Sequence, residues 1–126
     1  MLAIVQILAI LAALVHVYIF TLESVRFRDV RVHRGIFAVE RDDVEGVRPW
    51  AFNQGFYNLF LAIGTFVGAI LVRPEPAAGW ALIVLGCGSM VAAALVLVAT
   101  DRRMVKAAAS QGTIPALALL ASLTQL

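Results

Sequence analysis

The sequence predicts an all-α, polytopic membrane protein whose four transmembrane helices pack in a compact bundle. Hydrophobic residues make up 62% of the 126-residue chain and charged residues only 14%, which is more apolar surface than a soluble domain of this size can bury. The apolar residues also gather in long blocks of the roughly 20 residues that span a bilayer core. A helix is the expected form because it satisfies its own backbone hydrogen bonds in lipid. We therefore expect one membrane domain over residues 1–126.

The expected helices cover residues 2–24, 49–72, 77–100 and 110–126. The first block is interrupted only by Gln6 and His16. The second block contains no charged residue from Trp50 to Val72, and the third contains none from Ala77 to Thr100. Pro49 suits the first turn of the second helix, where its missing N–H costs nothing. Prolines in "VRPEPAAG" indicate a tight turn before the third helix. The fourth block reaches about 17 residues, the lower limit of a span.

The basic residues predict the orientation of the helices. Of the ten Lys and Arg residues, nine lie in two loops, at 25–48 and 101–109, which four spans place on the same side. The positive-inside rule makes that side cytoplasmic, so loop 25–48 is cytoplasmic and both termini lie on the non-cytoplasmic side. Five acidic residues largely neutralise the first loop, which argues against a nucleic-acid partner and leaves the lipid bilayer as the expected one.

Polar residues concentrate in the cytoplasmic half that this topology defines. Glu23 lies at the inner end of the first helix, and His16 is seven residues away, about 10 Å deeper and on the same face. The second helix begins with a polar group, followed by glycines at Gly64 and Gly68. The polar group consists of Asn53, Gln54, Tyr57 and Asn58. Its members pair at a spacing of four residues and lie one or two turns into the membrane.

These side chains indicate either a pocket open to the cytoplasm or polar contacts between helices. Carboxamides often hydrogen-bond across helices, but four polar side chains in six residues exceed what such contacts need, and they supply both donors and acceptors. His16 is a functional candidate because ionisable groups within spans are rare; the alternative is a neutral, hydrogen-bonded histidine. Glu23 is either a proton carrier or a carboxylate paired with Arg26, Arg102 or solvent. We expect Asp101 and Arg102 to form an interfacial ion pair, and Gly64 and Gly68 to pack within the bundle more readily than at a dimer seam.

Three strings resemble the Domain of Unknown Function 1304 family of small four-helix membrane proteins. They are "HVYI" followed by "LE", "AFNQGFYNLFLAIG" and "QGTIPALALL". The resemblance covers nearly the whole chain, is most specific in N-Q-G-x-Y-N, and is weakest at 25–48. It implies the fold and the membrane location, which we expect to be the inner (plasma) membrane, but no function. It also implies the signature positions His16, Tyr18, Glu23, Asn53, Gln54, Gly55, Tyr57, Asn58, Gln111 and Pro115.

The resulting candidates fit three functions. The first is binding or transport of a small molecule by His16, Tyr18, Glu23, Asn53, Gln54, Tyr57, Asn58 and Gln111. The second is a membrane-embedded enzyme with isomerase-like acid–base chemistry on a lipophilic substrate, for which the catalytic candidates are His16, Glu23 and Tyr57. The third is a structural or partner-binding protein, and a homo-oligomer fits all three. No metal site is expected because no second His or Cys lies at ligand spacing; haem through His16 is the one cofactor considered.

Overall fold

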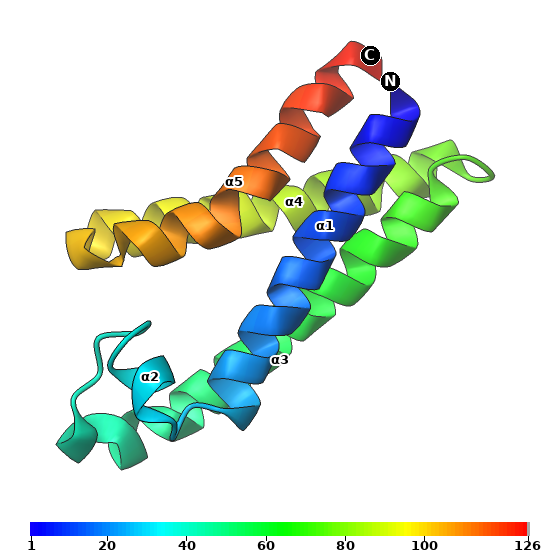
Figure 1. The fold of residues 1–126 in the computed structure, drawn as a ribbon. Helices are drawn as coiled ribbons and strands as arrows, with labels where there is room; N and C mark the ends of the chain where they lie inside the picture. Colours follow the sequence, from blue (N-terminus) through cyan, green and yellow to red (C-terminus); the bar gives the residue numbers. More distant parts are fainter. Residues whose placement is uncertain (126) are drawn as a thin grey trace.

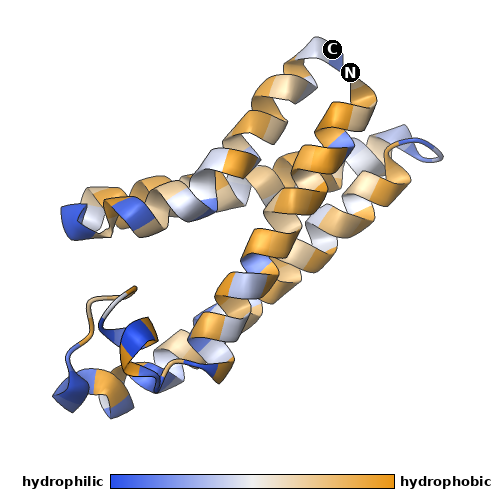
Figure 2. Ribbon diagram, in the orientation of Figure 1, coloured by the Kyte–Doolittle hydropathy of each residue, from blue (hydrophilic) through white to orange (hydrophobic). Residues whose placement is uncertain are grey.

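The computed structural model describes residues 1–125 and consists of helices joined by short connections (Figure 1). The long helices are α1 (Leu2–Phe20), α3 (Val44–Leu71), α4 (Pro76–Thr100) and α5 (Val105–Ser122). Within the described residues there is no strand. Four helical stretches are long and apolar enough to cross a membrane, and they form a bundle, as predicted. In Figure 2 the hydrophobic residues cover these helices, and the hydrophilic ones gather at the connections.

Two helices begin earlier than hydropathy predicts. The predicted helix at 49–72 starts at Val44, after a 3₁₀ turn at Arg41–Asp43, and the predicted helix at 110–126 starts at Val105. Polar residues form the first turns of both helices, ahead of the apolar blocks, because a helix can extend beyond the hydrocarbon core of the bilayer. Pro49 therefore lies inside α3 and not in its first turn.

A π turn extends α1 at Thr21–Val25, and a short helix, α2 (Val30–His33), follows it in the loop. The π turn is closed by the Arg26 N–H, which donates to the Thr21 carbonyl at 2.9 Å. A π turn holds one residue more than an α turn, so the side chains after Thr21 are rotated relative to a continuous α-helix.

The main cluster of buried hydrophobic residues lies toward the end of the bundle that carries both termini; Figure 1 shows both termini at this end. The buried cluster there is rich in small residues, including Ala9, Ala12, Ala69 and Cys87. Gly68 faces α4 so closely that an added Cβ would lie 2.8 Å from the Leu82 Cβ, whereas an added Cβ at Gly64 would meet nothing within 4 Å. Gly68 therefore packs within the bundle, and Gly64 does not.

A polar residue of α1 near the N-terminus, Gln6, is also bonded within the bundle. Gln6 donates from Nε2 to the Ala69 carbonyl at 2.7 Å and accepts at Oε1 from Arg73 Nε at 2.9 Å. These contacts join α1 to α3 and help to close the terminal end.

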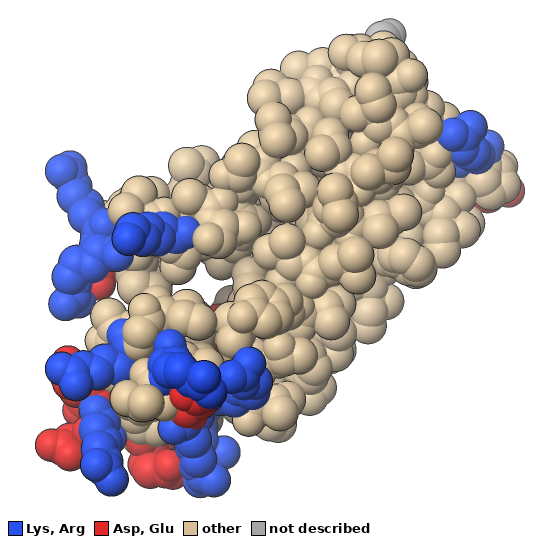
Figure 3. Space-filling view, viewed as in Figure 1, with Lys and Arg blue, Asp and Glu red and all other residues tan. Residues whose placement is uncertain are grey.

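At the opposite end, which we call the basic end, the helix pairs diverge. This end carries residues 26–48 and 101–106, and Figure 1 shows the α1–α3 pair and the α4–α5 pair separating toward it. Helix α5 changes direction midway, near Pro115, which lies inside the helix and lacks the N–H that the Gln111 carbonyl would otherwise bind. Figure 3 shows a gap between the two arms at the basic end, beside the clustered Lys and Arg side chains.

Candidate functional site

A cavity of about 460 Å³ lies between the diverging helix pairs, and we call it the polar cavity. Five side chains singled out in the sequence line it: His16, Glu23, Gln54, Asn58 and Gln111. They come from α1, its π turn, α3 and α5, and α4 adds an apolar wall that includes Met90 and Leu97. The structure thus brings together polar groups that are separated by up to 95 positions in the chain.

A hydrogen bond between Glu23 and Asn58 connects the first and second spans in this cavity. Asn58 Nδ2 donates to Glu23 Oε2 at 2.8 Å and lies 3.3 Å from the carbonyl of Gln54, one turn earlier in α3. Asn58 is 8% exposed. On the sequence alone, Arg26 and Arg102 are candidate partners of Glu23, but neither forms an ion pair with it. The amide of Asn58 contacts Glu23 instead. Because Asn58 occupies one carboxylate oxygen, the other oxygen, Oε1, is left to accept from a ligand.

Close approach of α3 to the π turn makes this bond possible. At Gly55 an added Cβ would overlap Ser24 Oγ and would lie 3.1 Å from the Glu23 Cβ. Ser24 Oγ donates to the Phe52 carbonyl at 2.8 Å, which adds a second interhelical hydrogen bond at the same level. The glycine in "NQG" therefore serves contact between helices, and the π turn directs both Glu23 and Ser24 toward α3.

His16 lies deeper in the bundle and is 1% exposed. Its Nδ1 donates to the Ala12 carbonyl at 2.9 Å, one turn earlier in α1. A neutral imidazole with this bond presents Nε2 as an acceptor. No hydrogen bond joins Nε2 to any group of residues 1–125, so His16 retains one acceptor at the level of Met90.

Gln111 reaches the cavity from α5, one turn before Pro115. Pro115 has no N–H, so the Gln111 carbonyl lacks its usual helical donor. The Gln111 carboxamide can supply both a donor and an acceptor at the cavity.

The remaining candidates are placed elsewhere. Asn53 lines a neighbouring cavity of about 360 Å³ that also includes Glu23 and Trp50. Tyr57 is 58% exposed on the outer face of α3 and is not among the residues that line the polar cavity, although it is adjacent in sequence to Asn58. Tyr18 is 56% exposed and lines a third cavity, between α1 and α5.

The connection between α1 and α3 carries a residue that sequence patterns did not reveal, Phe37. It lines the polar cavity and both of its neighbours. Phe27 packs against it with ring centroids 5.8 Å apart, and His33 Nδ1 donates to the Val39 carbonyl at 2.8 Å. Ala38, next to Phe37, has a φ of 56°, which is uncommon for a residue with a side chain. No periodicity marks such a loop, so no pattern in the sequence predicts the position of Phe37.

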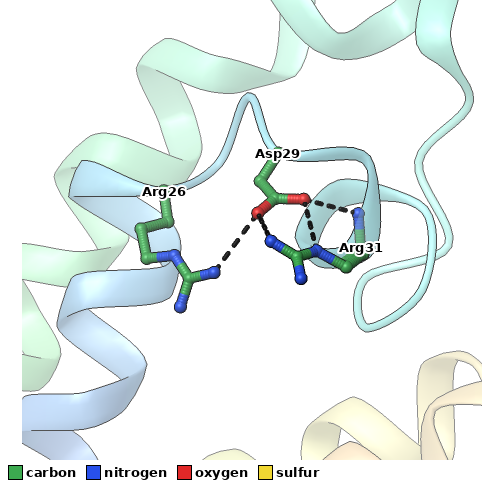
Figure 4. Close-up of polar contacts among 3 residues, drawn as sticks. All are labelled: Arg26, Asp29 and Arg31. Atoms are coloured by element: carbon green, nitrogen blue, oxygen red, sulfur yellow. Dashed lines mark hydrogen bonds and ion pairs between the residues drawn. The ribbon is translucent and has the colours of Figure 1, made fainter.

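Ion pairs hold the same connection together (Figure 4). Asp29 caps α2 by accepting from the Arg31 N–H at 2.9 Å, and its carboxylate contacts the guanidinium of Arg31 at 3.0 Å and that of Arg26 at 3.2 Å. Hydrogen bonds from the Arg31 side chain and backbone, with a smaller contribution from Arg26, hold the pKa of Asp29 well below its ordinary value.

The ion pair expected at the end of α4 forms with a different residue. Asp101 contacts Arg103 at 2.8 Å, and not Arg102. Asp101 caps the following 3₁₀ turn by accepting from the Arg103 N–H. This geometry also brings the Arg103 side chain close to the Asp101 carboxylate. Hydrogen bonds from Arg103 also lower the pKa of Asp101.

The free polar groups of the cavity are suited to hydrogen bonding. Among the residues described, no three His, Cys, Asp or Glu side chains lie close enough to hold a metal ion. The free groups of the polar cavity are carboxamides, one carboxylate oxygen and one imidazole nitrogen, which offer hydrogen-bond donors and acceptors.

No curated protein and no solved structure matches the chain. A family model described as "Protein of unknown function (DUF1304)" matches residues 10–123. This range includes α3, α4 and α5, the second half of α1 and every candidate residue named above. The chain therefore belongs to the DUF1304 family.

Proposed function

We propose that this protein binds a small polar or amphipathic molecule in the polar cavity and carries it into or across the membrane. The observation that supports this is the convergence of five polar side chains from three spans on one cavity of about 460 Å³. Where a polar side chain serves only to join helices, its groups are bonded within the bundle, as the Gln6 amide is to the Ala69 carbonyl. In the polar cavity, by contrast, Glu23 and His16 each keep an acceptor that no described residue binds.

The orientation is part of the proposal. The basic end carries nine of the ten Lys and Arg residues, and the positive-inside rule assigns it to the cytoplasm. Both termini then lie on the opposite side, and the membrane is the inner (plasma) membrane of the cell. In this orientation the cavity opens toward the cytoplasm, and His16 lies at its inner end.

The free groups favour a ligand that donates hydrogen bonds. Glu23 Oε1 accepts hydrogen bonds when the carboxylate is ionised, and His16 Nε2 accepts them when the imidazole is neutral. The carboxamides of Gln54 and Gln111 can accept or donate. A hydroxyl or ammonium group satisfies them better than a carbonyl or an ether does.

Thiol modification at one pair of neighbouring positions tests whether the cavity is accessible to water. Ala93 lines the polar cavity, whereas Ala92 is exposed on α4 and is not among the residues that line it. In a Cys87→Ala background we expect Ala93→Cys to react with a charged, membrane-impermeant thiosulfonate in vesicles. Ala92→Cys should not, because a thiolate does not form in hydrocarbon. Equal rates at both positions would contradict the proposal.

Uptake by reconstituted vesicles separates transport from a static role. We expect His16→Ala and Glu23→Gln to abolish proton-coupled uptake of the ligand if these groups carry the proton. If both variants bind and transport like the wild type, the polar residues are structural.

An enzyme is the second candidate, because His16 and Glu23 line one cavity without bonding to each other. A substrate between them would contact an acid and a base at once. An enzyme would be favoured if the wild type converts a substrate without transporting it and both His16→Ala and Glu23→Gln lose this conversion. A Soret absorption band that is lost in His16→Ala would show that haem is bound through His16.

A further inference from the structure

A second opening runs along the membrane-facing side of the polar cavity, and we call it the lateral groove. It has a volume of about 300 Å³ and lies between α1, α5 and residues 35–37 of the connection. Its apolar wall includes Val15, Ile19, Leu22 and Ile36. This wall matches an alkyl chain and not a polar solute.

The groove reaches well into the bilayer. Val15 precedes Val25, the last residue of the first span, by ten positions, which corresponds to about 15 Å of helix. That is about half of a hydrocarbon core roughly 30 Å thick. An occupant along this wall therefore lies beside lipid tails and must itself be apolar over that length.

The opposite end of the groove is cationic. Lys106 lines it, together with Ser110 and Gln111. No ion pair joins Lys106 to an acidic residue in the part of the chain that the structure describes. The Ser110 hydroxyl donates to the Lys106 carbonyl at 2.8 Å, which fixes this turn of α5. An unpaired ammonium beside an apolar wall complements an anionic headgroup with an attached chain.

The lateral groove adjoins the polar cavity. Phe37, Ala107 and Gln111 line both, so Phe37 on one side and α5 on the other separate the two spaces. The gap visible in Figure 3 lies in this region, between the arms of the basic end. A molecule in the groove can thus extend a polar group past Phe37 toward Glu23 and the carboxamides.

We infer that the ligand is a membrane-dissolved amphiphile with an alkyl chain, an anionic group and at least one hydroxyl, which enters sideways through the lateral groove. The chain lies along α1, the anion binds Lys106, and the hydroxyl donates to the acceptors of the polar cavity. This inference rests on the proposed binding function and specifies its substrate class. It differs from uptake of a water-soluble molecule through the basic end.

Native mass spectrometry with two defined lipids tests the inference. Phosphatidylglycerol has the anion, the hydroxyls and the chains, whereas phosphatidylcholine is zwitterionic and has no hydroxyl in its headgroup. We expect the wild-type protein to retain phosphatidylglycerol about tenfold better than phosphatidylcholine, the least effect of one hydrogen bond to a charged group. Lys106→Gln should remove this preference, and Ile19→Trp, which fills the groove, should lower retention of both lipids.

The matched control is Arg102→Gln. Arg102 is also a basic residue at this end and also lacks an ion pair among the described residues, but it does not line the groove. We expect it to retain the wild-type preference. Equal retention of the two lipids by the wild type, or an equal effect of Lys106→Gln and Arg102→Gln, would overturn the inference.

Thiol modification at Ala93 distinguishes the two possible failures. If Ala93→Cys reacts while the lipid preference is absent, the binding cavity stands and the substrate class is wrong. If Ala93→Cys is as unreactive as Ala92→Cys, the proposed function itself fails.

Discussion

Replacement of Gly55 by alanine tests whether contact between the π turn and α3 holds the candidate site together. The added methyl group overlaps Ser24 Oγ and comes within 3.1 Å of the Glu23 Cβ, so the Ser24 hydroxyl must move and the two helices must shift apart by a few tenths of an ångström. Separation weakens both the Ser24–Phe52 and the Glu23–Asn58 hydrogen bonds. Gly55→Ala is therefore expected to destabilise the protein although alanine is the better helix former.

The expected loss is about 1 to 3 kcal/mol in the free energy of unfolding. Overpacking of a close contact costs about 1 to 3 kcal/mol, and each of two interhelical hydrogen bonds adds about 0.6 kcal/mol. The higher helix propensity of alanine offsets about 1 kcal/mol of this cost. Unfolding in mixed micelles by increasing amounts of denaturing detergent, followed by circular dichroism, measures this difference.

Two further variants make the Gly55 prediction specific. Gly64→Ala on the same helix adds a methyl group with no atom within 4 Å, so it should be neutral or stabilise by up to about 1 kcal/mol. In a Ser24→Ala background the overlapping hydroxyl is gone and the nearest side-chain carbons lie 3.1 and 3.2 Å away. The remaining overpacking of about 1 kcal/mol is then offset by a helix-propensity gain of about 1 kcal/mol, so Gly55→Ala should be close to neutral. The reasoning is refuted if Gly55→Ala costs the same with and without Ser24, or no more than Gly64→Ala.

Three other predictions concern the cavity, the connection and the core. Asn58→Leu should lower the free energy of unfolding by about 1 to 3 kcal/mol, because Glu23 loses its hydrogen-bond donor; a double-mutant cycle with Glu23→Leu should show a coupling of at least about 0.5 kcal/mol, and additive losses would contradict the contact. Since the folded pKa of Asp29 is lowered by Arg31, its contribution to stability is complete above the ordinary pKa of an aspartate and is lost as the pH falls below it. Pepsin cleavage of the connection should therefore rise with acidity relative to Asp29→Asn, and a constant ratio would count against the cap. Cys87 is 0% exposed, so it should react with thiol reagents only after unfolding; rapid labelling of the folded protein would show that the core packing is wrong.

The sequence predicted the number and order of the spans because uncharged blocks of sufficient length have few alternatives in lipid. Hydropathy did not predict where α3 and α5 begin, since Glu45 and Lys106 continue helices whose first turns lie outside the apolar blocks. For α3 the sequence does carry a separate signal, because "RDDVEGVRPW" indicates a helical lead-in with Asp42 or Asp43 as N-cap, and Asp43 is the N-cap of α3. Hydropathy reports the position of hydrocarbon, and backbone hydrogen bonds determine the helix boundary.

For the candidate site, the depth of each side chain in the membrane could be predicted from the sequence, but the direction in which it points could not. The spacing of charges placed His16, Glu23 and Asn58 at one end of the bundle, and all three line one cavity. The same reasoning put Tyr57 with them, but one residue of a helix turns by about 100°, and Tyr57 lies on the outer face. The π turn and the position of Phe37 depend on packing between distant segments, which no local pattern records.

The divergence of the two helix pairs toward the basic end makes ligand width a criterion for selection. The space between the pairs narrows from the mouth toward His16 and Met90, where the tightly packed terminal cluster begins. We therefore expect a slender group, such as a hydroxyl-bearing alkyl arm, to reach the imidazole more readily than a ring system does. Two molecules with the same polar groups but different breadth would then differ in their contact with His16.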